Sequence, residues 1–158
     1  MAKLKPAALA EGDPAPDFVL HTDRGTPLRL SDLKGRNVVL YFYPRADTPG
    51  CTIEACQFRD AFASFGDAVI LGVSPDAPAR QAKFKAKYEL PFTLLADVDK
   101  TAAAAYGVWK EKTMYGKKVM GIERTTFLIG KDGRIRRIFT KVKPDGHAAE
   151  VSRALSSL

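Results

Sequence analysis

Residues 38–51 of the chain, VVLYFYPRADTPGC, carry its clearest structural pattern. Val38–Tyr43 is apolar without alternation, which is typical of a central strand that is buried on both faces. Pro44 ends this strand because proline has no N–H for the ladder, and the Thr-Pro pair at 48–49 suits the start of a helix. We therefore predict a buried strand and a short loop, followed by a helix whose first turn contains Cys51.

Strand and helix patterns alternate along the rest of the chain, which predicts an α/β fold with a sheet covered on both sides. An early pair of short strands flanks Asp23-Arg24-Gly25 and indicates a hairpin. Strands are predicted at Phe18–Leu20, Leu28–Leu30, Ala68–Val73, Thr125–Ile129 and, in a more polar form, Ile135–Val142; helices are predicted at 52–65, 77–88, 99–106 and 145–157, with a single helical turn at Ser31–Gly35.

Length and composition indicate one globular domain. The 158 residues are enough for one hydrophobic core, so we expect a single domain over 1–158 with a loosely held lead-in over about 1–12. Apolar residues make up 46% and charged residues 27%, which excludes a disordered chain and a membrane bundle. No apolar run approaches the roughly 20 residues of a membrane span. The N-terminus lacks the apolar centre of a secretory signal, so a cytoplasmic location is expected.

The chain is basic, with 25 Lys and Arg against 18 Asp and Glu, a net charge of +7. Such a surplus can indicate a nucleic acid or an acidic membrane as a partner. Here the basic residues are spread over helices, turns and the last strand, without an arginine-rich arm. We therefore expect neither a nucleic acid nor a membrane partner.

The two cysteines, Cys51 and Cys56, are the most informative residues by count. A structural disulfide usually closes a longer loop in a secreted protein, whereas a close pair in a reducing compartment indicates catalysis or metal binding. The two histidines, His21 and His147, are too distant in sequence for a zinc-site spacing, and both are expected to be exposed. Catalysis is therefore the favoured interpretation.

Helical spacing gives the two cysteines different surroundings. Cys51 begins an apolar stripe that continues through Ala55, Phe58, Phe62 and Phe65, so it is expected to point toward the core. Cys56 lies on a different and more polar stripe of the same predicted helix. Near the N-terminus of a helix, free N–H groups and the helix dipole stabilise a thiolate over a thiol.

A disulfide between the two cysteines is incompatible with an intact helix. Residues five apart on an ideal helix have Cα atoms about 8 to 9 Å apart. A disulfide needs less than roughly 7 Å. If Cys51 and Cys56 both lie on the helix, its first turn and a half must melt before the bridge can form. Attack on peroxide would also need donors aimed at the departing oxygen. The candidates are the Thr48 hydroxyl, the Cys51 backbone N–H and an arginine that spacing cannot identify.

Residues 41–56, YFYPRADTPGCTIEAC, closely resemble the peroxiredoxins of the bacterioferritin comigratory protein, or peroxiredoxin Q, subfamily. The Pro-x-x-x-Thr-x-x-Cys pattern within this stretch is highly specific. The resemblance also includes 11–18, 106–112 and 120–129, so only about the first ten residues lie outside it.

The resemblance implies a thioredoxin-like fold, a central mixed sheet flanked by helices on both faces. It implies that Cys51 is the peroxidatic cysteine and Cys56 the resolving one. Pro44 would shield the site from water, Thr48 would hold the peroxide oxygen, and Arg124 would lie against the thiolate and the peroxide. Glu54 matches a residue common in the subfamily.

The same resemblance implies hydrogen peroxide and alkyl hydroperoxides as substrates and thioredoxin or a similar dithiol protein as reductant. It implies no metal, flavin or haem cofactor. Members are often monomers, although some dimerise. No departure from the family pattern occurs at the site positions, and the presence of Cys56 argues against the single-cysteine variant.

Alternative interpretations remain for several of these residues and for the whole protein. Thr48 could be an ordinary helix cap, and Glu54 could simply favour the positive end of the helix. A thiol–disulfide oxidoreductase would share the fold, although it would require Cys-x-x-Cys. A basic binding module without enzymatic activity is the alternative from another class.

Overall fold

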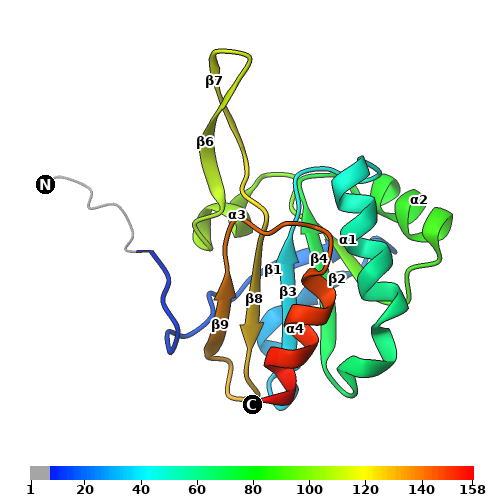
Figure 1. The fold of residues 1–158 in the computed structure, drawn as a ribbon, viewed down its shortest axis with the longest axis vertical. Helices are drawn as coiled ribbons and strands as arrows, with labels where there is room; N and C mark the ends of the chain where they lie inside the picture. Colours follow the sequence, from blue (N-terminus) through cyan, green and yellow to red (C-terminus); the bar gives the residue numbers. More distant parts are fainter. Residues whose placement is uncertain (1–7) are drawn as a thin grey trace, which may run out of the picture.

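A computed structural model describes residues 8–158, and its centre is a seven-stranded mixed sheet (Figure 1). The strand order is β2-β1-β5-β4-β3-β8-β9. β3 pairs in parallel with β4 and antiparallel with β8. The strands are β1 (Val19–Thr22), β2 (Pro27–Arg29), β3 (Val38–Phe42), β4 (Val69–Ser74), β5 (Thr93–Ala96), β8 (Thr125–Ile129) and β9 (Ile135–Phe139).

Helices cover both faces of this sheet, as expected from the sequence. The side chains of β3 alternate, so Val39 and Tyr41 enter one core while Val38, Leu40 and Phe42 enter the other. The first core is covered by α1 (Pro49–Asp60), α2 (Pro78–Tyr88) and α4 (His147–Ser156), and the second by α3 (Thr101–Ala105) and the 3₁₀ turn η1 (Leu30–Leu33).

The helix that carries both cysteines differs in its bounds from the predicted 52–65. It begins at Pro49 and ends at Asp60, and a separate 3₁₀ turn, η2, follows at Phe62–Phe65. The break removes Phe62 from the predicted apolar stripe, and its side chain is 40% exposed. The expected core position of Phe62 was therefore wrong, whereas Cys51, Ala55, Phe58 and Phe65 are buried.

A second sheet, which the sequence patterns did not predict, consists of two strands only. β6 (Trp109–Met114) pairs antiparallel with β7 (Lys117–Ile122), and neither strand joins the main sheet. The pair projects as an arm from the end of the molecule where β3 leads into α1 (Figure 1).

The N-terminal segment is partly fixed. The Gly12 N–H donates to the Ile135 carbonyl at 2.7 Å, and Arg134 Nη1 donates to the Gly12 carbonyl at 3.0 Å. The expected loose lead-in over about 1–12 therefore does not extend to Gly12, while residues 1–7 lie outside the described part of the chain.

His147 is buried, not exposed as the sequence interpretation had it, whereas His21 is exposed. The ring of His147 packs edge-on against Phe58 and Phe139, its Nε2 lies 2.7 Å from Thr126 Oγ1 and its Nδ1 lies 3.0 Å from Glu150 Oε1. Burial lowers the pKa of this imidazole. Among residues 8–158, no helix has the length and apolar character needed to cross a membrane.

Candidate active site

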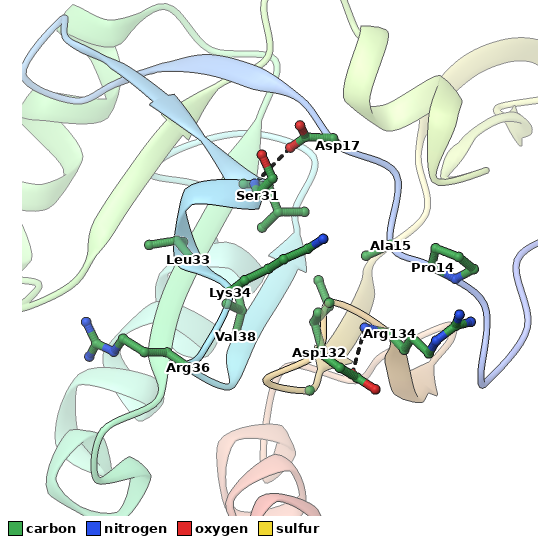
Figure 2. A pocket seen from close by; sticks show the side chains of 14 residues that line it. Pro14, Ala15, Asp17, Ser31, Leu33, Lys34, Arg36, Val38, Asp132 and Arg134 are labelled. Atoms are coloured by element: carbon green, nitrogen blue, oxygen red, sulfur yellow. Dashed lines mark hydrogen bonds between the residues drawn. The ribbon is translucent and has the colours of Figure 1, made fainter.

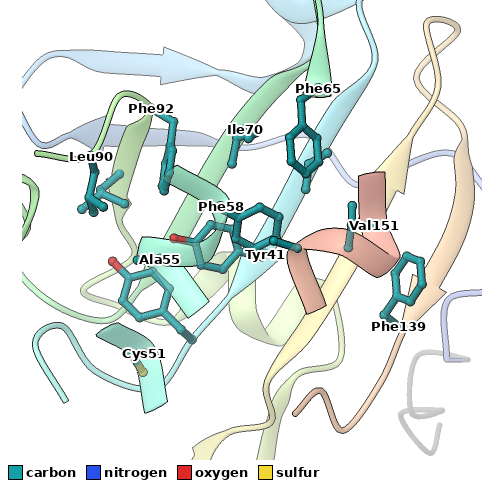
Figure 3. Close-up of a cluster of buried hydrophobic side chains, with 14 of the residues drawn as sticks. Tyr41, Cys51, Ala55, Phe58, Phe65, Ile70, Leu90, Phe92, Phe139 and Val151 are labelled. Carbon is teal, nitrogen blue, oxygen red and sulfur yellow. The ribbon is translucent and has the colours of Figure 1, made fainter. Parts of the chain in front are cut away.

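The loop after β3 brings Cys51 into the core at the carboxyl end of the central strand. Pairing continues only to the Tyr43 N–H, which donates to the Val73 carbonyl, and Pro44 follows with no donor. Helix α1 then starts at Pro49, so Cys51 lies in its first turn. The Cys51 side chain is 1% exposed and belongs to the cluster of Tyr41, Ala55 and Phe58 (Figure 3).

Arg124 reaches Cys51 from the neighbouring antiparallel strand. Phe42 at the end of β3 pairs with Thr125 at the start of β8, so the residue before Thr125 lies at the same end of the sheet as the loop. Arg124 Nη2 is 3.3 Å from Cys51 Sγ, and Nη1 is 2.7 Å from Glu54 Oε1. One guanidinium thus bridges the thiol and a carboxylate.

Gly50 leaves the room that this arginine needs, a feature that the sequence interpretation missed. A Cβ at position 50 would lie 3.2 Å from Arg124 Nη2 and 3.4 Å from Pro144 Cγ. Any larger residue would therefore press on the guanidinium. The sequence signal was the glycine directly before Cys51, in a helical first turn where glycine has no conformational advantage.

Glu54 is fully buried, one helical turn after Cys51 on the same side of α1. Burial raises its pKa to about 7, although the charge and hydrogen bond of Arg124 act in the opposite direction. Burial also disfavours the charge on Arg124, but Glu54 and Cys51 outweigh this cost and the pKa of the guanidinium is raised. Glu54 is thus the partner of Arg124 rather than a charge at an exposed helix end.

The other residues predicted for the site are Thr48, Pro44 and Cys56. Thr48 is the N-cap residue of α1, but its hydroxyl donates to the Arg45 carbonyl at 2.9 Å and makes no capping bond. Pro44 is half-buried in the loop. Cys56 is half-buried on the same continuous helix as Cys51, and both thiols are free. The predicted sharing of one helix by the two cysteines is confirmed.

The loop itself is held by polar side chains that the sequence interpretation did not single out. Asp76 Oδ2 accepts from the Ala46 N–H at 2.7 Å and from Ser74 Oγ at 2.6 Å. Its Oδ1 pairs with Arg80 Nε at 3.0 Å, and Arg80 Nη2 donates to the Ala46 carbonyl at 3.4 Å. Both backbone groups of Ala46 are therefore fixed by the Asp76–Arg80 pair.

The next loop residue is fixed in the same way. Asp47 has a positive φ of 60°, a strained value for a residue with a side chain. Its carboxylate accepts from Lys87 Nζ at 2.9 Å and from Tyr88 Oη at 2.8 Å, both near the end of α2. Helix α2 thus holds the loop in the shape that leads into Cys51.

These residues define a thiol-based oxidoreductase site on a mixed α/β sheet. A buried cysteine at a helix N-terminus, with a guanidinium 3.3 Å from its sulfur, can support a thiolate and a nearby developing negative charge. In the part of the chain that the structure describes, no three His, Cys, Asp or Glu side chains come together as a metal site would require.

Comparisons with known proteins agree with this class. A family model described as the AhpC/TSA family matches residues 11–138. Peroxiredoxin Bcp of Bacillus subtilis is 52% identical over 149 residues, covering 93% of this chain and 95% of the relative. Peroxiredoxin Bcp of Escherichia coli is 43% identical over 141 residues, covering 88% and 90%.

Solved structures give the same result. Peroxiredoxin Q of Xanthomonas campestris matches with a TM-score of 0.85 and 42% identity over 89% of this chain and 90% of the other. PrxQ of Xylella fastidiosa matches with a TM-score of 0.90 and 38% identity over 96% and 98%. The chain belongs to the AhpC/TSA family and, within it, to the thioredoxin-like thiol peroxidases of the Bcp and peroxiredoxin Q group. The resemblance found in the sequence is thereby confirmed.

Proposed function

We propose that this peroxidase reduces hydrogen peroxide and alkyl hydroperoxides through a sulfenic acid on Cys51. The observation that carries the proposal is the contact of Arg124 with both Cys51 and Glu54. The Cys51 thiolate attacks one peroxide oxygen, the O–O bond breaks, and the sulfur becomes a sulfenic acid. The departing oxygen leaves as hydroxide or alkoxide and takes up a proton, giving water or an alcohol.

In this step Arg124 stabilises the thiolate and the charge that develops on the departing oxygen. The Thr48 hydroxyl, which lies at the start of the same helix, would hold the peroxide, and Pro44 would keep water from the sulfur. Glu54 fixes the guanidinium through the 2.7 Å bond to Nη1, leaving Nη2 for the sulfur. Glu54 is thus proposed as a positioning residue.

Cys56 then resolves the sulfenic acid. Its thiolate attacks the Cys51 sulfur, the S–O bond breaks, and water and an intramolecular disulfide are formed. Because both residues lie on continuous α1, the start of this helix must unwind first. Thioredoxin or a similar dithiol protein would return two electrons to the disulfide and restore both thiols.

The range of substrates has support from a relative. A solved structure of the Xanthomonas campestris bacterioferritin comigratory protein, 41% identical to this chain, concerns its alkyl peroxide reduction activity. We propose the same substrate class here, together with a monomeric state, a cytoplasmic location and no bound metal, flavin or haem.

Stopped-flow fluorescence of Trp109 tests the mechanism. The reduced protein is mixed with hydrogen peroxide, and the products are identified by mass spectrometry. We expect fast oxidation to an intramolecular disulfide in the wild type, no reaction in Cys51→Ser and arrest at the sulfenic acid in Cys56→Ser. A wild-type rate no faster than that of a free thiol, or one unaffected by Cys51→Ser, would favour a thiol–disulfide oxidoreductase instead.

A further inference from the structure

The β6–β7 arm has two different faces. Residues directly opposite one another in an antiparallel pair share a face, and residues two apart along a strand do so as well. The register pairs Lys112 with Val119 and Met114 with Lys117. One face, here called the lysine face, therefore consists of Lys110, Lys112, Met114, Lys117 and Val119.

The opposite face of the arm packs against the core at its base and carries an ion pair farther out. At its base, Ile122 is buried and Trp109 packs against the core beside α3. Farther out, Lys118 Nζ lies 3.6 Å from Glu111 Oε1. This face therefore contributes the attachment of the arm, one ion pair and one exposed apolar side chain, Met120, with 49% of its surface exposed.

The lysine face differs in that Lys117 has no ion-pair or hydrogen-bond partner for its side chain among residues 8–158. Its strands contribute three lysines and no carboxylate, and only Lys110 has an ion-pair partner among the described residues, Glu123 at 2.7 Å. Two apolar side chains lie between the lysines, Met114 with 52% and Val119 with 39% of its surface exposed. A two-stranded ribbon gains little by exposing such side chains to water, so this face is suited to a partner.

The base of the arm lies close to the catalytic cysteine, because β7 ends at Ile122, two residues before Arg124, whose Nη2 is 3.3 Å from Cys51 Sγ. Lys112 is close enough to Arg124 and Cys51 for both to act on its pKa, which burial, the largest influence, lowers. Its ammonium group donates to the Ile122 carbonyl at the base of the arm. The arm rises from the same end of the sheet as the loop before α1 (Figure 1). A protein large enough to reach a disulfide at the start of α1 would therefore meet the arm, and the lysine face offers it an unpaired lysine and exposed apolar side chains.

We propose that the lysine face is the docking surface for the dithiol protein that reduces the Cys51–Cys56 disulfide, and that this partner presents carboxylates and an apolar patch around its reactive cysteine. The inference rests on the proposed function. The partner's thiolate attacks one sulfur of the disulfide and forms a mixed disulfide. Its second thiol then displaces the enzyme cysteine, leaving two enzyme thiols and an oxidised partner.

Charge favours this occupant over a second copy of the chain. A copy would bring a net charge of +7 and the same lysines to the contact, and like charges oppose association. An acidic partner would instead be attracted, which raises the association rate at low salt. Methionine adapts its shape to a partner surface, which suits contacts that form and separate in every catalytic cycle.

Neighbouring lysines on opposite faces provide a matched test. Lys117→Glu changes the lysine face, and Lys118→Glu makes the same charge change on the other face. An acidic thioredoxin is the probe, with peroxide saturating. We expect Lys117→Glu to lower kcat/KM for thioredoxin about tenfold and to flatten its salt dependence, with less than about a twofold change for Lys118→Glu. Lys117→Gln should give an intermediate value.

Dithiothreitol, a small uncharged reductant, separates this inference from the proposed function. With dithiothreitol, both charge variants should consume peroxide at the wild-type rate, which also shows that they are folded. No peroxide consumption by the wild type would refute the proposed function itself. Normal consumption with equal thioredoxin kinetics in the two variants would refute only the docking surface.

Two further results would overturn the assignment in favour of another occupant. One is a dimer of the wild type in sedimentation that Lys117→Glu dissociates. The other is retention on a heparin column above about 0.2 M salt that Lys117→Glu abolishes while thioredoxin kinetics stay unchanged, since charge-driven polyanion binding falls steeply over that range.

Discussion

Glu54 and Arg124 form a buried ion pair directly beside the reactive sulfur. Burial is the largest influence on the pKa of the Glu54 carboxyl group, and it raises that pKa. One oxygen, Oε1, accepts a hydrogen bond from Arg124 Nη1, while Oε2 has no hydrogen-bond partner among residues 8–158. An unpartnered buried oxygen favours the protonated carboxyl group. The pair therefore gives the arginine a fixed position, but the ionised carboxylate costs stability.

This cost predicts a pH dependence of the free energy of unfolding. The pKa of Glu54 rises from its ordinary 4.5 to about 7 in the folded protein. Between these values the folded state binds more protons at Glu54 than the unfolded state does, so the contribution of this group to stability is fully present below about pH 4.5 and is lost as pH rises through about 7. The loss should be about 3 kcal/mol, since one pKa unit is about 1.4 kcal/mol.

Urea unfolding at about pH 5 and pH 7.5 checks this prediction, because linear extrapolation gives the free energy at each pH. Glu54→Gln should lose this part of the decline, whereas the exposed control Glu111→Gln should keep it. An equal decline in wild type and Glu54→Gln would show that another group is responsible.

At this site the sequence pattern predicted Cys51, whereas only the family resemblance predicted Arg124. Cys51 follows from a strand, a loop and a helix start that are local in the chain. Arg124 is 73 residues away, and no spacing rule links the two; only the antiparallel pairing of β3 and β8 does so. The burial of Glu54 could have been predicted, because its spacings of three from Cys51 and four to Phe58 place it on the apolar side of the helix.

At the scale of elements, α2 holds the loop that leads into Cys51. The Asp76–Arg80 pair fixes both backbone groups of Ala46, and the carboxylate also accepts from Ser74. Ser74 in turn accepts from Gln81, whose Oε1 accepts from Tyr43 Oη. A connected network of this kind gives a defined loop shape only while each member keeps its partner.

We therefore expect Asp76→Asn to slow the reaction with peroxide. The amide has no charge for Arg80 and offers a donor where the carboxylate accepts, so the loop should shift. A displacement of about 1 Å near a reacting atom can cost up to a hundredfold in rate, and we expect at least a tenfold fall in kcat/KM for peroxide. Dithiothreitol-driven turnover at limiting peroxide measures it.

The matched control for this substitution is Asp132→Asn. Asp132 pairs with Arg136 at 2.8 Å with the same i,i+4 spacing, and it lies near the opposite end of the sheet beside the pocket of Figure 2. Asp132→Asn should leave kcat/KM for peroxide unchanged. A wild-type kcat/KM in Asp76→Asn would mean that Ala46 needs no such support.

The sequence predicted buried elements better than exposed ones. Val38–Tyr43 and Thr125–Ile129 stand out because strands buried on both faces are continuously apolar. The strands of the arm carry charges on both faces and show no apolar alternation, so their pattern resembles a loop. The short strand β5 was not predicted, and its strand character depends on its pairing with β4 and β1.

For the whole molecule, the two cores share the strands of one sheet, and this predicts one cooperative unfolding transition. β3 contributes alternate side chains to both cores, so neither core can be lost while the other keeps its packing. Small domains of this kind usually unfold in two states. Lys100 Nζ, directly before α3, lies over the ring of Trp109 at 5.4 Å from its centroid, so the fluorescence of Trp109 reports on the α3 side.

Urea titration of the reduced protein, followed by Trp109 fluorescence and by far-ultraviolet circular dichroism, measures this cooperativity. The two midpoints should coincide, because Ile122 and Trp109 attach the arm to the core that contains Phe42. Tyr115→Ser at the fully exposed tip should leave both midpoints unchanged. A fluorescence midpoint at clearly lower urea would mean that the base of the arm and α3 unfold as a separate unit, because two probes of a two-state transition must agree. The docking surface on the arm would then be able to move independently of the cysteines that it serves.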